Sequence, residues 1–161
     1  MDRRVVAILA STVLLGGVVA AVLIARGGDD SESAASTDLA AKPEVEVPEG
    51  PTPEELVSED LAEGDGATAE TGDEVTVQYV GVDYETGEEF DSSWERPEPL
   101  GFQLGGGQVI EGWDEGVAGM REGGRRRLVV PPDLAYGRRG SPPAIGPNAT
   151  LVFVVDLVSV E

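Results

Sequence analysis

The order of apolar and polar residues divides the chain into regions with different patterns. Residues 5–25 are apolar or small and carry no charge, and a helix of this length rises about 30 Å, the thickness of a bilayer core. We therefore predict a transmembrane signal-anchor in residues 1–26. A cleaved signal peptide is the alternative, because Val19–Ala21 offers small residues for cleavage, although its apolar run usually covers about 7–15 residues.

The last region, residues 53–161, has mostly the pattern of β-strands. Apolar and polar residues alternate over Val75–Tyr79, and Glu85–Gly87 is typical of a turn. A further strand ends at Val130, because the two prolines that follow cannot extend a ladder. Residues 150–160 predict a long final strand, whose one face carries Leu151, Phe153, Val155 and Leu157.

One segment of this region, Val109–Met120, has a helical pattern. Its glycines each cost roughly 1 kcal/mol relative to alanine, so we expect packing of Trp113 and Val117 to hold the helix. The predicted fold class is α+β, with an antiparallel sheet, or half-barrel, wrapped around one short α-helix.

The middle region, residues 27–52, is acidic and rich in Ser, Ala and Pro, with Lys42 as its only cation. Such a segment cannot bury enough apolar surface to offset the entropy of ordering. We predict an acidic disordered linker here. Arg3 and Arg4 precede the apolar run and acids follow it, which places the N-terminus in the cytoplasm by the positive-inside rule. We expect a single-pass protein of the cell membrane with residues 53–161 outside, or a secreted protein if the segment is cleaved.

Composition then limits the chemistry. The chain has no cysteine and no histidine, which excludes disulfides, thiol nucleophiles, Cys/His zinc sites and Ser-His-Asp triads. Its formal net charge of -20 would repel phosphates, so we expect no nucleic-acid partner. We also expect no metal and no cofactor.

Five segments carry a family resemblance. They are Phe90–Ser93 (FDSS), Leu104–Trp113 (LGGGQVIEGW), Gly116–Met120 (GVAGM), Leu134–Gly137 (LAYG) and Ala149–Leu157 (ATLVFVVDL). In order and spacing they resemble the FKBP-type peptidyl-prolyl cis-trans isomerases, and the resemblance covers residues 53–161.

The resemblance implies site residues. Trp113 matches the tryptophan at the base of the family's proline pocket, Ile110 offers a backbone N–H, Tyr136 a phenol, and Asp91 lies at the rim. The residues implied as catalytic are Tyr79, Phe90, Asp91, Ile110, Trp113, Tyr136 and Phe153. Those implied to bind substrate are Val109, Leu100, Phe102, Ser141, Ala144 and Ile145.

The chain departs from the family's usual pattern at the rim of the pocket. Leu100 stands where many members carry an aromatic residue, Ser141 and Ala144 occupy a flap that is often bulkier, and Arg138 and Arg139 precede this flap. A second basic run, Arg125–Arg127, is interpreted as a strand face that pairs with nearby acids.

The implied activity needs no acid, base or nucleophile. Rotation about an X-Pro bond meets a barrier of about 18–20 kcal/mol from amide resonance, and a dry pocket disfavours the charge-separated planar amide more than the twisted one. We expect an isomerase that acts on extracytoplasmic polypeptides during folding. The alternative is a module that holds proline peptides with incidental turnover. The implied partners are proline-containing polypeptides and macrolide inhibitors.

Overall fold

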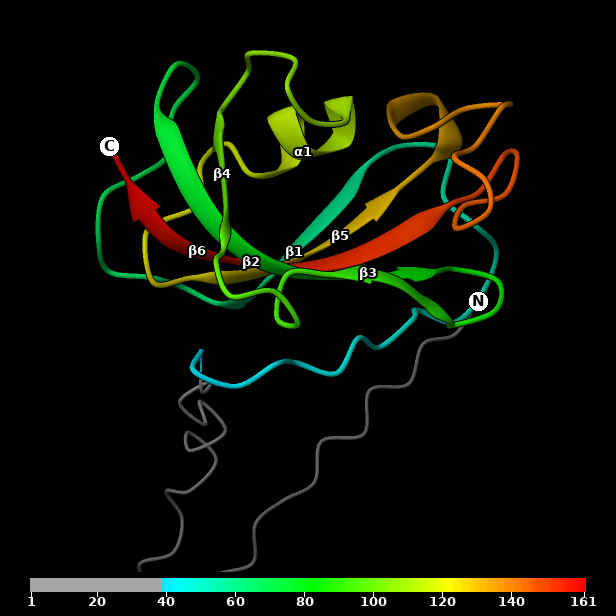
Figure 1. The fold of residues 1–161 in the computed structure, drawn as a ribbon, viewed down its shortest axis with the longest axis horizontal. Coiled ribbons are helices and arrows are strands. Elements are labelled where there is room, and N and C mark those ends of the chain that lie inside the picture. Colours follow the sequence, from blue (N-terminus) through cyan, green and yellow to red (C-terminus); the bar gives the residue numbers. More distant parts are fainter. Residues whose placement is uncertain (1–38) are drawn as a thin grey trace, which may run out of the picture. The chain divides into compact units, whose positions relative to one another are not determined.

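The computed structural model describes residues 39–161, and in this part of the chain six strands form one sheet around a short helix (Figure 1). The strands are β1 (Val57–Ala62), β2 (Glu74–Asp83), β3 (Glu89–Ser92), β4 (Leu100–Gln103), β5 (Arg125–Val130) and β6 (Leu151–Val160). The helices of this part of the chain are α1 (Glu111–Gly116) and the short 3-10 helix η2 (Pro132–Leu134). The predicted α+β fold class is therefore confirmed.

The two longest strands, β2 and β6, form the centre of the sheet. They pair antiparallel from Val75 opposite Val160 to Asp83 opposite Leu151. On the far side of β6 come β5 and then β1, while the far edge of β2 is shared by β4 along its first half and β3 along its second. The strands β3 and β4 therefore pair with different parts of the same edge of β2.

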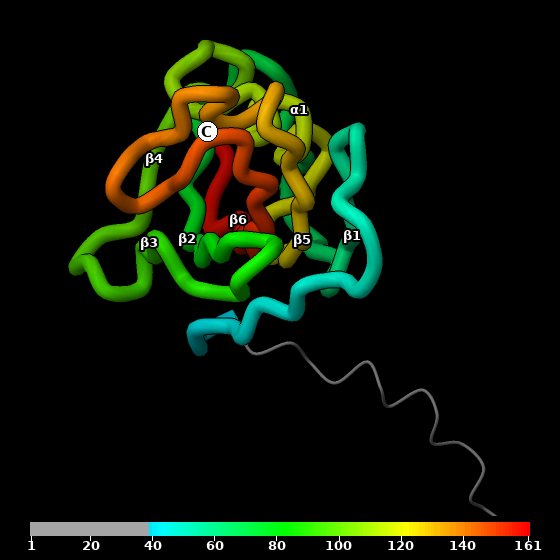
Figure 2. Tube along the Cα trace, turned by 90° about the vertical axis from the view of Figure 1, so that its right-hand side faces the viewer, coloured from blue at the N-terminus to red at the C-terminus, as the bar shows by residue number. Residues whose placement is uncertain are grey.

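The concave face of the sheet holds the main core, which alternation along the strands predicts. Leu151, Phe153, Val155 and Leu157 of β6 are buried there. Trp113 and Val117 pack against them from α1 and its C-terminal end. Figure 2 shows the strands curving around this space.

The helix is shorter than the predicted Val109–Met120. It begins after Ile110, whose backbone is extended, and ends at Gly116, with the Val117 N–H donating to the Trp113 carbonyl. Gly119 has φ +87, a left-handed conformation that stops a helix. The helical glycines permit close packing: a Cβ on Gly112 would collide with Val130, and one on Gly116 would lie 2.7 Å from a methyl carbon of Leu128.

Residues 39–52, which we predicted as part of a disordered linker, lie along the convex face of the sheet (Figures 1 and 2). Val45 and Val47 pack on a second buried cluster, which comprises Val82, Tyr84, Val129 and Val152. The Tyr84 hydroxyl lies 3.3 Å from the carbonyl oxygens of Gly50 and Pro51. The composition of this segment is that of a linker, but its alternate valines find an apolar surface on the sheet.

The basic run Arg125–Arg127 does pair with acids, in three different environments. Arg125 is buried and forms two hydrogen bonds with the Asp156 carboxylate, at 2.5 and 2.6 Å, and a third with the Ala41 carbonyl. Arg126 faces the helix, where it donates to the Gly116 carbonyl at 2.8 Å and pairs with Asp60. Arg127 pairs with Glu59 at the surface. Strand alternation sends Arg125 and Arg127 to the convex face and Arg126 to the concave one.

Burial raises the pKa of the Asp156 carboxyl, and the Arg125 guanidinium partly offsets that rise. Both side chains are buried, so water does not compete for either partner of the ion pair. The same guanidinium donates to the Ala41 carbonyl, which ties residues 39–52 to the sheet.

The predicted transmembrane segment lies outside the described residues. Within residues 39–161, no helix combines the length and the apolar character needed to cross a membrane.

We predict that Arg125→Gln lowers the free energy of unfolding by about 3–5 kcal/mol, because it leaves Asp156 buried without a cation. Arg127→Gln removes a surface pair from the same strand and should cost less than about 1 kcal/mol. Urea unfolding of both variants measures the difference. The double variant Arg125→Met, Asp156→Leu should recover most of the loss, and equal losses in the two single variants would contradict the assignment.

Candidate active site

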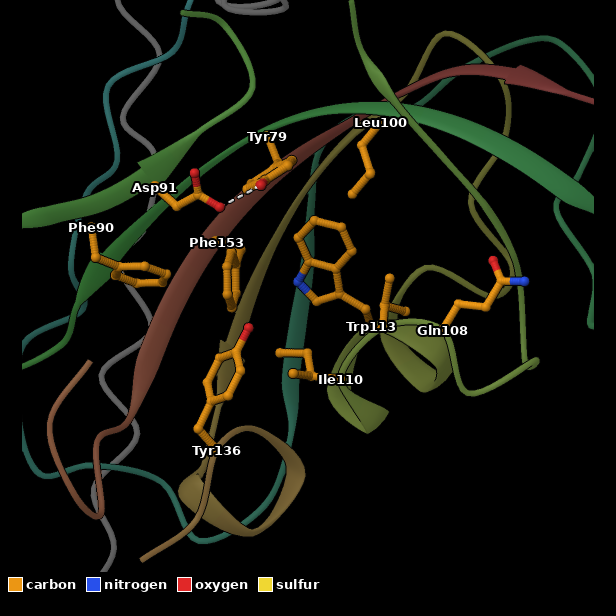
Figure 3. Close-up of a pocket in the computed structure, with 10 residues that line it drawn as sticks. Tyr79, Phe90, Asp91, Leu100, Gln108, Ile110, Trp113, Tyr136 and Phe153 are labelled. Carbon is orange, nitrogen blue, oxygen red and sulfur yellow. Dashed lines mark hydrogen bonds between the residues drawn. The ribbon is translucent and has the colours of Figure 1, made fainter. Parts of the chain in front are cut away.

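A pocket opens on the concave face of the sheet, between the start of α1 and the segment after η2 (Figure 3). Its volume is about 160 Å³, which is room for more than one water molecule. The lining residues come from four strands, the helix α1 and two loops, and they are Tyr79, Phe90, Asp91, Leu100, Gln108, Val109, Ile110, Trp113, Tyr136 and Phe153.

Three aromatic side chains form the floor and fix one another. The Trp113 ring is 4% exposed and meets Tyr79 at 4.8 Å and Phe153 at 5.3 Å between centroids, both edge to face. Phe90 meets Phe153 edge to face at 5.6 Å. Aromatic pairs favour edge-to-face or offset geometry over a face-to-face sandwich, so these contacts hold the rings in one apolar surface. The buried Trp113 indole N–H has no acceptor within residues 39–161.

The start of α1 places Trp113 in the floor. Ile110 is extended, with φ -60 and ψ 149, and its carbonyl accepts the Trp113 N–H at 2.9 Å. The N–H of Ile110 donates to no group in the described part of the chain. The Tyr136 hydroxyl has no partner there either, and its side chain points into the pocket beside Ile110 (Figure 3). Two donors are therefore available at one side of an apolar pocket.

The opposite rim carries a charged network. The Tyr79 hydroxyl donates to Asp91 at 2.5 Å and accepts from Arg96 at 3.1 Å, while Arg96 also forms an ion pair with Asp91. The Arg96 guanidinium carbon lies 5.9 Å from the centroid of the Tyr79 ring. Asp91 also accepts the N–H of Ser92. These partners occupy both carboxylate oxygens of Asp91.

Both phenols of the pocket stay protonated at neutral pH. Burial raises the pKa of Tyr79 to about 12, and the hydrogen bond to Asp91 adds to this rise. Burial also raises the pKa of Tyr136, with a smaller contribution from the charge of Asp91. Tyr136 therefore keeps its proton available for donation over the whole physiological range.

Comparison with known proteins agrees with this geometry. The family model described as FKBP-type peptidyl-prolyl cis-trans isomerase matches residues 66–158. The chain belongs to this family. A curated FK506-binding protein of Streptomyces anulatus is 58% identical over 120 residues, which cover 74% of this chain and 97% of that protein. A probable FK506-binding protein of Corynebacterium glutamicum is 54% identical over 118 residues, or 73% of this chain and 98% of the relative.

The solved structures agree as well. The crystal structure of AtFKBP13 superposes with a TM-score of 0.62 and 38% identity, covering 68% of this chain and 96% of that one. The chain is thus a peptidyl-prolyl cis-trans isomerase, and the resemblance inferred from the five segments is confirmed.

The structure brings most of the predicted site residues of the isomerase together. All seven residues implied as catalytic line the pocket, and so do Val109 and Leu100. Their roles in catalysis follow from position and stay predictions. Gln108 and Arg96 were not predicted. Gln108 lies immediately before Val109 in the loop, and its side-chain oxygen accepts the N–H of Gln103. No sequence signal marks Arg96 beyond its place five residues after Asp91.

Four residues predicted to bind substrate do not line this pocket, and their contact with substrate stays a prediction. Phe102 is buried behind the floor, 5.9 Å from Trp113 between centroids. Ile145 is buried in the core, and its backbone exchanges two hydrogen bonds of 2.9 Å with Ser141. Ser141 and Ala144 are exposed in the flap. The flap closes on itself through the pairing of Ser141 with Ile145.

The wall of the pocket depends on the absence of a side chain at Gly81 of β2. A Cβ there would lie 2.6 Å from the Phe90 ring and 2.7 Å from the Phe153 ring, closer than real Cβ contacts allow. The two rings can therefore meet edge to face only because position 81 is a glycine.

We predict that Gly81→Ala lowers the free energy of unfolding by about 1–3 kcal/mol through overpacking. It should also lower kcat/KM by about ten- to hundredfold, because displaced rings narrow the pocket. Gly101→Ala is the matched strand control, since a Cβ there meets its nearest atom at 3.8 Å. Urea unfolding and peptide isomerisation test both variants, and a Gly81→Ala enzyme with unchanged activity would contradict the prediction.

Proposed function

We propose that the protein accelerates X-Pro isomerisation in extracytoplasmic polypeptides during folding, by non-covalent binding of proline in its desolvated aromatic pocket. The observation that carries this proposal is the pairing of an apolar floor, made by Tyr79, Trp113 and Phe153, with the two available donors at Ile110 and Tyr136. The floor suits a prolyl ring, and the donors suit the carbonyls of the peptide on either side.

The mechanism follows from what the pocket contains. The planar amide carries charge separation on its oxygen and nitrogen, and the twisted transition state loses much of it. Apolar side chains such as Phe90 and Phe153 solvate the charge-separated planar amide less well than water does. They therefore raise the free energy of the planar ground state more than that of the twisted transition state. Each reduction of the barrier by about 1.4 kcal/mol gives a tenfold gain in rate.

The two donors supply orientation. A proline segment whose carbonyls accept from the Ile110 N–H and the Tyr136 hydroxyl is held while the bond between them rotates. Asp91 takes no part in proton transfer, because Tyr79, Arg96 and Ser92 already occupy its oxygens. Its contribution is to fix the Tyr79 ring in the floor. The curated relatives are named for binding FK506, and we propose that the same pocket takes macrolides of this class.

The extracytoplasmic location is supported by the sequence. Residues 5–25 have the length and apolarity of a membrane span, and Arg3 and Arg4 precede them. An anchored isomerase outside the cytoplasm would meet secreted and membrane chains as they emerge unfolded, when slow prolyl bonds limit their folding.

Tyr136→Phe tests the role of the phenol. Loss of one hydrogen bond predicts a two- to tenfold fall in kcat/KM on an X-Pro peptide, about 0.5–1.5 kcal/mol. Combining Phe90→Ala with Tyr136→Ala should lower activity further. Tyr84→Phe is the matched control, because its hydroxyl contacts the Gly50 and Pro51 carbonyls on the convex face. Unchanged activity in the double variant, or peptide binding without turnover in the wild type, would overturn the proposal.

The location has its own test. An anchored protein should sediment with isolated membranes at an intact mass near 16.8 kDa, and protease added outside intact cells or spheroplasts should remove the isomerase domain. A smaller mass in the medium would indicate a cleaved signal peptide and a secreted enzyme. A protease-resistant domain inside the cell would overturn the extracytoplasmic assignment.

A further inference from the structure

Two arginines beside the pocket stand apart from the other cations of the described residues. Arg138 and Arg139 are exposed and have no ion pair or side-chain hydrogen bond within residues 39–161. Every other cation in this part of the chain contacts a carboxylate or a carbonyl through its side chain, namely Lys42, Arg96, Arg121, Arg125, Arg126 and Arg127. In a chain with a formal net charge of -20, two adjacent arginines without a partner are unexpected.

The backbone holds these arginines close to the pocket mouth. Tyr136 lines the pocket, and its carbonyl accepts the Gly140 N–H at 3.1 Å, which closes a turn around Arg138 and Arg139. Gly137 has φ +60, donates to the Pro132 carbonyl at 2.8 Å and accepts the Asn148 N–H at 2.9 Å. The Arg138 Cα therefore lies at most about 7.6 Å from that of Tyr136, on a turn tied to both sides of the flap.

The charges around the pocket mouth are unequal. Across the pocket, the charge of Asp91 is matched by Arg96. On the flap side, Asp133 of η2 is the acid nearest in sequence, and it pairs with neither arginine. The positive charge of the turn is thus not neutralised locally. At physiological salt the screening length is about 8 Å, so the charge of this turn acts on a bound peptide that passes directly over it.

We propose that Arg138 and Arg139 are specificity residues, which favour proline segments with Asp or Glu within a few residues of the proline. The inference rests on the proposed function, because it assumes that the chain beside the bound proline passes over the turn that follows Tyr136. Exposed ion pairs are individually weak, so two of them give a two- to tenfold preference in kcat/KM over a neutral peptide, and this preference falls as salt is raised.

The test uses the full-length protein and short peptides with one proline, in which Glu, Gln or Lys stands one, two or three residues before or after it. Exchange spectroscopy by NMR gives kcat/KM for each peptide at physiological and at high salt. The wild type should prefer Glu over Gln, and Gln over Lys, at one or more positions. The charge-reversed variant Arg138→Glu, Arg139→Glu should favour Lys instead. Arg121→Gln, an exposed arginine outside the pocket lining, is the control for net charge and should keep the wild-type ratio.

Several outcomes separate the inference from the proposed function. Equal kcat/KM for Glu and Gln peptides at every position overturns the inference and leaves the isomerase function intact. A Glu preference that survives charge reversal, or that Arg121→Gln abolishes equally, overturns it as well. Isomerisation at the uncatalysed rate for all peptides overturns the proposed function itself. Measurement of peptide binding by chemical shift, in the same samples, shows whether the preference arises in affinity.

Discussion

The edge-to-face packing of Trp113 against Tyr79 and Phe153 connects the parts of this domain on which the site depends. It joins the helix to the two central strands, because Tyr79 belongs to β2 and Phe153 to β6. The same three rings are both core and pocket floor. An enzyme that works by excluding water needs a surface that does not rearrange when proline enters, and rings fixed by their neighbours provide it.

This packing is possible because small residues let the backbones approach. Gly112 and Gly116 lie against Val130 and Leu128 of β5, and Gly81 lies under the Phe90 and Phe153 rings. The glycines that weaken α1 as an isolated helix are thus the residues that allow it to sit close to the sheet. Local propensity and tertiary packing conflict in this segment, and burial of Trp113 and Val117 decides the outcome.

Much of this arrangement could be predicted from the sequence, since alternation in residues 75–79 and 151–157 indicates the strands and one face of the core. The spacing of the five segments indicates the family and hence the pocket. Other features depend on contacts between distant residues. The acidic composition of residues 39–52 gives no sign that Val45 and Val47 are packed, because the residues that they contact are far away in the sequence. The pattern of β4 places Leu100 and Phe102 on one face, yet only Leu100 reaches the pocket because Trp113 covers Phe102.

Under the membrane anchoring that we propose, the segment on the convex face has a consequence. Residues 39–52 are packed on the sheet, so they belong to the domain. The tether that would join an anchor to the domain therefore ends at residue 39 and not at residue 53. Its fully extended reach from Arg26 is then about 45 Å, roughly half of what the longer segment would allow. Residues 39–52 lie on the face of the sheet opposite the pocket, so this segment does not cross the path by which an unfolded chain arrives.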